Sequence, residues 1–90
     1  MTDIEKARNV IDDIDGEIAR LFEKRMAAVK IIAEYKSAHS LPVFDAEREK
    51  ELIEKNVKRI ENENLKDYYL SFLTSVIDVS KKYQHSLISK

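Results

Sequence analysis

The sequence predicts an all-α fold with three helices per chain: one long, one short and one of intermediate length. From Ile4 onward, apolar residues recur at alternating steps of three and four for more than four heptads, as on one face of a long helix. The 90 residues include one Gly and one Pro, so a fold of many strands and tight hairpins is disfavoured. A chain of this length is expected to form a single domain over residues 1–90.

The first helix is predicted over about residues 3–39. Gly16 lies inside it and costs about 1 kcal/mol relative to alanine, which does not end a helix. Pro42 marks its end, because a proline disfavours the helical conformation of the residue before it. One face carries residues spaced by three or four, with a single charged member: Ile4, Ala7, Ile11, Ile14, Ile18, Leu21, Arg25, Ala28, Ile32 and Tyr35.

Two shorter helices follow, over about residues 45–61 and 65–87. Asp45 is the expected N-cap of the second helix, and Glu47 and Glu49 complement the helix dipole in its first turn. The polar stretch 61–64 is expected to end it, and Asn64 is the expected cap of the third helix. The apolar row of the third helix is Leu65, Tyr69, Phe72, Val76, Val79 and Tyr83.

The first helix is too long for a compact domain of this size. At 1.5 Å per residue it would measure about 55 Å, whereas a compact 90-residue domain has a radius of gyration of about 12 Å. One end must therefore extend beyond the rest of the chain and expose its apolar face. We expect this part to pack on a second copy of the chain in a two-fold homodimer.

Composition and charge argue against several classes of function. The 16 basic and 17 acidic residues nearly cancel, so no nucleic-acid partner is expected. Without cysteine, and with His39 and His85 outside any metal-ligand spacing, no disulfide, thiol nucleophile or metal site is expected. No signal peptide and no apolar run of about 18 residues is present. We therefore expect a cytoplasmic protein with no membrane partner.

Charged residues on the apolar face of the first helix are candidates for binding an anion. Arg25 interrupts that face. It could bind a ligand, set the register of the helix packing, or extend its side chain so that the charge reaches water at the helix edge. Lys36 lies eleven residues later on the same side, about 16 Å away, and its alternative is a solvated lysine. Arg8 is about 25 Å from Arg25 along the helix, so it could join that site only from an antiparallel partner chain; it could also be solvated.

The other two helices add polar candidates. Asp45, Arg48 and Glu49 share one face of the second helix, although the pattern alone favours Arg48 and Glu49 as exposed members of a charged first turn. Ser80 and Gln84 interrupt an apolar row of the third helix one turn apart. Such groups need hydrogen-bond partners if buried, from a ligand or from another helix.

Taken in order, these residues resemble a known family, the all-helical chorismate mutases. The resemblance covers nearly the whole chain. It rests on Arg8, Asp15, Arg25, Lys36, the segment Pro42-Val43-Phe44-Asp45-Ala46-Glu47-Arg48-Glu49 and the segment Ser80-Lys81-Lys82-Tyr83-Gln84. It implies an intertwined homodimer of three-helix chains with two active sites, which convert the dianion chorismate to prephenate on the route to Phe and Tyr.

The resemblance also implies a role for each candidate. Arg25, with Arg8 donated by the partner chain, would bind the two carboxylates of the substrate, and Ser80 would help to hold a carboxylate. Lys36 and Gln84 would contact the ether oxygen of the breaking bond, so Lys36, Gln84 and Arg25 are the expected catalytic residues. The remaining substrate-binding residues would be Glu49 on the ring hydroxyl, the backbone near Asp45, and Arg48.

The implied reaction is a unimolecular rearrangement that needs no nucleophile, metal or cofactor. Two alternatives stay open at this point. A related helical enzyme, isochorismate pyruvate-lyase, handles a similar dianion, but Glu49 and Ser80 fit the mutase pattern better. A helical dimerisation module without catalysis is what composition and heptads alone would favour, and the six polar residues Arg8, Arg25, Lys36, Glu49, Ser80 and Gln84 weigh against it.

Overall fold

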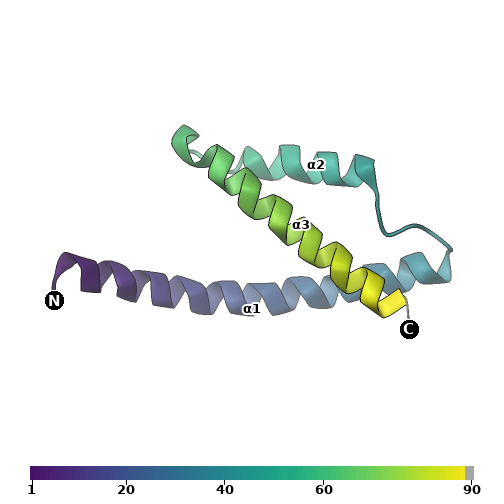
Figure 1. The fold of residues 1–90 in the computed structure, drawn as a ribbon, viewed down its shortest axis with the longest axis horizontal. Helices are drawn as coiled ribbons and strands as arrows, with labels where there is room; N and C mark the ends of the chain where they lie inside the picture. The colour runs from purple at the N-terminus through teal and green to yellow at the C-terminus, as the bar shows by residue number, and fades with distance from the viewer. Residues whose placement is uncertain (89–90) are drawn as a thin grey trace.

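The computed structural model describes residues 1–88 and confirms the all-α class. Helix α1 spans Asp3–Ala38, α2 spans Ala46–Val57 and α3 spans Lys66–Ile88, with a short 3₁₀ helix, η1, over Glu63–Leu65 before α3. No strand occurs among the described residues. Figure 1 shows α1 as one continuous rod, and α3 crosses it obliquely near its C-terminal end. Helix α2 lies on the side of α3 that faces away from α1.

Both ends of α1 are capped by local hydrogen bonds. The Thr2 hydroxyl accepts from the backbone N–H of Glu5 at 3.2 Å and donates to the Glu5 carboxylate at 2.9 Å. At the other end, Ser40 adopts a left-handed conformation with φ of 53°, and the N–H of Leu41 donates to the carbonyl of Lys36 at 2.8 Å. This is a Schellman motif, so the chain leaves the helix just before Pro42.

Helix α2 is shorter than predicted, because it ends at Val57 rather than near residue 61. The N–H groups of Arg59 and Ile60 donate to carbonyls three residues earlier, so the final turn tightens and the helix stops. The predicted cap of the third helix is also wrong. The side chain of Asn62, not Asn64, accepts a hydrogen bond at the start of η1, from the N–H of Asn64 at 3.0 Å. The propensities of residues 58–61 did not reveal this early stop.

The core is small and lies where α3 meets the C-terminal half of α1. Its buried apolar residues are Val29, Ala33, Val43, Leu73 and Ile77. The radius of gyration is 16.4 Å and the molecule measures 55 × 27 × 15 Å, well above the value of about 12 Å for a compact domain of this length. The chain is therefore an elongated body in which packing is concentrated at one end.

The N-terminal half of α1 has no packing partner within the described chain. Every residue from Met1 to Lys24 is exposed. The isoleucines of its apolar row, Ile4, Ile11, Ile14 and Ile18, are 46–57% exposed. Figure 1 shows this end of α1 extending away from α2 and α3. None of the helices described has the length and apolar character that crossing a lipid bilayer requires.

Candidate active site

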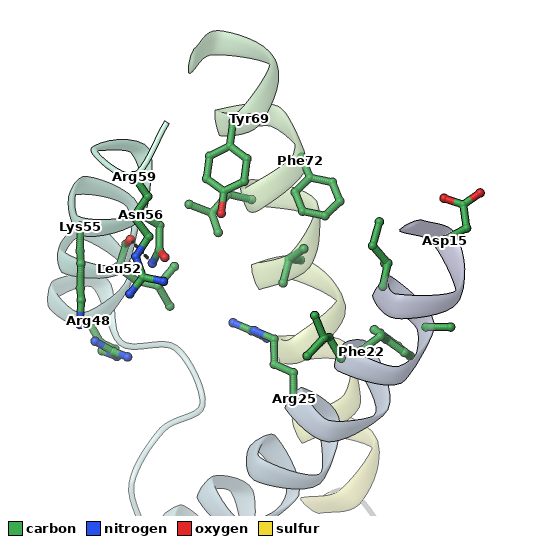
Figure 2. Close-up of a pocket in the computed structure, with 15 residues that line it drawn as sticks. Asp15, Phe22, Arg25, Arg48, Leu52, Lys55, Asn56, Arg59, Tyr69 and Phe72 are labelled. Atoms are coloured by element: carbon green, nitrogen blue, oxygen red, sulfur yellow. Dashed lines mark hydrogen bonds between the residues drawn. The ribbon is translucent and has the colours of Figure 1, made fainter. Parts of the chain in front are cut away.

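A cavity of about 880 Å³ lies between the three helices and receives cationic side chains from two of them. Arg25 enters it from α1, Arg48 and Lys55 line it from α2, and Arg59 lines it from the turn that follows α2. Figure 2 shows the guanidinium of Arg25 directed toward α2, where Arg48 stands on the opposite wall. The apolar part of the lining comes from Ile18, Ala19, Leu21, Phe22, Leu52, Tyr69, Phe72, Leu73 and Val76.

Arg25 is held in place by α3. Its guanidinium donates a hydrogen bond to the hydroxyl of Ser80, and that hydroxyl donates to the carbonyl of Val76 at 2.9 Å. Ser80 is 6% exposed and Arg25 is half-buried. The interhelical partner that Ser80 required is therefore Arg25. Because a guanidinium has five N–H donors in a fixed plane, this anchor leaves others free for a ligand.

Gln84 lies one turn after Ser80 and is 7% exposed. Its side-chain oxygen is buried and has no hydrogen-bond partner among the described residues. Leaving such a group unpaired costs about 1–3 kcal/mol, so proteins seldom keep one without a use for it. The amide of Gln84 is consequently the clearest sign in α3 of a polar group reserved for a ligand.

Lys36 is half-buried, and its ammonium donates to the backbone carbonyl of Val43 at 2.8 Å. This bond ties the end of α1 to the loop that precedes α2. Lys36 is therefore not the freely solvated lysine of the alternative interpretation, although in this conformation it serves the loop and not a ligand.

The first turn of α2 presents the remaining candidates. The carboxylate of Asp45 accepts from the backbone N–H of Arg48 at 3.0 Å, which makes Asp45 the N-cap. Glu49 is half-buried, and its carboxylate lies 2.9 Å from the ammonium of Lys81 on α3. This hydrogen bond to Glu49 raises the pKa of Lys81 above its ordinary value of 10.5. The pair thus fixes the first turn of α2 against α3.

Of the predicted site residues, Arg25 and Arg48 line the cavity, whereas Lys36, Asp45, Glu49, Ser80 and Gln84 do not. Arg8 does not line it either. It is exposed on the unpacked half of α1, about 25 Å before Arg25 along the helix axis. Asp15, a member of the quoted pattern, lies at the edge of the cavity on the same helix, and Figure 2 shows its carboxylate directed outward. Within one chain, Arg8 and Arg25 cannot hold a single small molecule.

The structure adds residues that sequence reasoning missed. Lys55 on α2 and Arg59 in the turn after α2 line the cavity together with Arg48. The spacing of seven residues places Arg48 and Lys55 on one face of α2, a signal that was available in the sequence. Lys81 follows Ser80 directly in the sequence, but nothing local indicates its partner on α2.

Comparison with known proteins places this geometry in a family. A family model described as chorismate mutase type II matches residues 7–85. A bifunctional chorismate mutase/prephenate dehydratase of Buchnera aphidicola subsp. Schizaphis graminum is 36% identical over 89 residues, which are 98% of this chain and 23% of that protein. A protein of the same description from Aquifex aeolicus is 44% identical over 55 residues, which are 61% of this chain and 15% of that protein.

The fold and the match over residues 7–85 define an all-helical protein of the chorismate mutase class. The chain belongs to the chorismate mutase type II family, as the resemblance in its sequence implied. It spans less than a quarter of the length of the curated relatives that it matches. No solved structure matches it.

Proposed function

We propose that this chain catalyses the rearrangement of chorismate to prephenate. The observation that carries the proposal is the guanidinium of Arg25, which is anchored by Ser80 and faces a cavity with Arg48 on its opposite wall. Fixed arginines bind carboxylates with defined geometry, and chorismate is a flexible dicarboxylate that must fold before it reacts. Membership of the family supports the same reaction.

The chemistry asks for orientation and charge stabilisation only. As the C–O bond of the ether stretches, negative charge grows on its oxygen. An ammonium from Lys36 and an amide N–H from Gln84 would bind this charge more strongly in the transition state than in the ground state. Gln84 is buried on α3 one turn after Ser80, and Lys36 would exchange its carbonyl partner at Val43 for the substrate.

The other residues would bind the parts of the substrate that do not react. Glu49 would accept the ring hydroxyl beside the backbone near Asp45, and Arg48 would orient the ring from α2. Arg25 would bind one carboxylate, with Ser80 holding the guanidinium and contributing to the same carboxylate site. No step requires a metal, a cofactor or a covalent intermediate.

We further propose a homodimer in which each site receives Arg8 from the partner chain. The exposed isoleucines on the N-terminal half of α1 provide an apolar face that needs a cover. The cavity beside Arg25 has an apolar lining that suits a helix of this kind. A two-fold arrangement would place the partner's helix beside each cavity and would bring the second arginine to each dicarboxylate.

The decisive experiment is a chorismate absorbance assay on the purified chain, with isochorismate as a parallel substrate. Formation of prephenate from chorismate is the expected result. Salicylate and pyruvate from isochorismate, without prephenate formation, would instead identify a pyruvate-lyase. A folded chain that turns over neither compound would contradict catalysis and favour a dimerisation module.

A further inference from the structure

An ion pair between α2 and α3 includes the candidate site residue Glu49, and the reaction described above assigns no role to its other partner, Lys81. The ammonium of Lys81 lies 2.9 Å from Oε1 of Glu49, and the two side chains are 29% and 25% exposed. The same ammonium lies 5.1 Å from the centroid of the Phe44 ring, within cation–π range. Lys81 therefore contacts α2 and the loop before α2 from its place on α3.

A second carboxylate competes weakly for Lys81. Asp78, one turn earlier on α3, lies 3.8 Å from the ammonium, and its side chain is 57% exposed. The contact with Glu49 is shorter and better shielded from water, so it is the stronger of the two. It is also the contact that joins different helices, and it therefore decides where the carboxylate of Glu49 points.

We propose that Lys81 is a positioning residue for Glu49. It binds one carboxylate oxygen of Glu49, leaves the other oxygen to accept the ring hydroxyl of the substrate, and offsets the negative charge of Glu49. This inference rests on the proposed function, because it concerns the same site and the same dianionic substrate.

Charge explains why such a residue is needed. A carboxylate is a strong acceptor for a hydroxyl, but an unpaired carboxylate repels a dianion at short range. With Lys81 bound, the Glu49–Lys81 pair is neutral and still offers a free oxygen. The ring hydroxyl takes no part in bond breaking, so its contact stabilises the ground state and the transition state nearly equally. Loss of Lys81 should consequently raise KM and change kcat little.

The test compares Lys81→Met with Lys82→Met, which removes the exposed neighbouring charge. In Lys81→Met, we expect KM for chorismate to rise at least about fivefold and kcat to stay within about threefold of the wild-type value. In Lys82→Met, both constants should stay within about twofold of the wild-type values. Lys81→Arg should restore KM, because a guanidinium also binds a carboxylate and stacks on an aromatic ring. Circular dichroism identifies folded variants, and Lys81→Gln replaces Lys81→Met if the latter does not fold.

A double-mutant cycle with Glu49→Gln separates positioning from direct binding. The glutamine keeps an acceptor oxygen and removes the charge, so adding Lys81→Met to it should change KM by less than about twofold. An increase in KM as large as in the wild-type background would show that Lys81 binds the substrate itself and would overturn the inference. So would an unchanged KM in folded Lys81→Met.

Failure of the underlying function gives a different result. A folded wild-type chain that leaves chorismate unchanged overturns the proposed function and this inference together. Normal turnover by the wild-type chain, combined with an unaltered KM in the folded Lys81 variant, overturns the inference alone.

Discussion

The guanidinium of Arg25 on α1 donates a hydrogen bond to the hydroxyl of Ser80 on α3, 55 residues later in the chain. The hydroxyl of Ser80 donates its own hydrogen bond to the carbonyl of Val76, so its oxygen is oriented to accept from Arg25. This relationship turns a charged residue in an apolar row into a fixed donor that faces the cavity. The position of the Arg25 guanidinium on α1 therefore depends on the packing of α3.

Replacing Ser80 by alanine should free Arg25 and weaken carboxylate binding. A hydrogen bond to a charged group contributes about 1.5–3 kcal/mol, so we expect kcat/KM for chorismate to fall about tenfold or more in Ser80→Ala. Ser86→Ala is the matched control, because the exposed Ser86 donates a hydrogen bond to the carbonyl of Tyr83 in its own helix. Steady-state kinetics on both variants give the comparison, and a loss below about twofold in Ser80→Ala would contradict the anchoring role.

Removing the ammonium of Lys36 should act on the chemical step. In Lys36→Ala, the developing charge on the ether oxygen loses its cation, and kcat should fall by several orders of magnitude while the chain stays folded. Lys30→Ala removes an exposed lysine from the same helix and should leave kcat near the wild-type value. A loss of less than about tenfold in Lys36→Ala would count against its assigned role.

The buried amide of Gln84 should show opposite effects on stability and activity. In Gln84→Leu, an unpartnered polar group gives way to an apolar one of similar size, so the free energy of unfolding should stay constant or rise by about 1 kcal/mol. The kcat for chorismate should fall at least about a hundredfold, because the ether oxygen loses its N–H donor. Urea unfolding and kinetics measure the two effects. A destabilised variant with full activity would contradict the prediction.

Sharing of sites across chains can be tested by mixing two inactive variants. Arg8→Ala and Arg25→Ala each damage both sites of their own homodimers. A heterodimer of the two has one site with both arginines intact, so mixing should recover activity as subunits exchange.

The control for this mixture is proof of exchange, for example with two chains that carry different tags. No recovered activity despite verified exchange would argue against a donated Arg8. Sedimentation of the wild-type chain should show a dimer, and a folded monomer at micromolar concentration would contradict the proposed assembly.

The Glu49–Lys81 pair predicts a pH dependence of stability at the alkaline end. The pKa of Lys81 is raised in the folded chain, chiefly by its hydrogen bond to Glu49, so the folded state holds its proton more tightly than the unfolded state. The resulting stabilisation is fully present below pH 10.5, the ordinary pKa of lysine, and is lost as pH rises through the folded pKa. Urea unfolding of wild type and Lys81→Met should therefore differ at neutral pH and converge at strongly alkaline pH. A difference that persists there would contradict the ion pair.

Much of the fold follows from local sequence. The row of apolar residues from Ile4 predicts one long helix, and Asp45 caps α2 as expected. The end of α2 at Val57 could not be predicted, because it depends on hydrogen bonds that tighten the last turn and on the cap at Asn62. Helix ends depend on such competition between nearby polar groups more than on propensity.

The candidate site, too, could be predicted from the sequence only in part. Sequence order and spacing selected Arg25, Lys36, Glu49, Ser80 and Gln84, since residue type and helical period are local properties. The partners of these residues were decided only by tertiary structure: Ser80 for Arg25, the Val43 carbonyl for Lys36, and Lys81 for Glu49. The physical reason is that each contact joins separate helices or a helix and a loop. Its geometry therefore depends on how α1 and α2 pack against α3, and no local pattern records that packing.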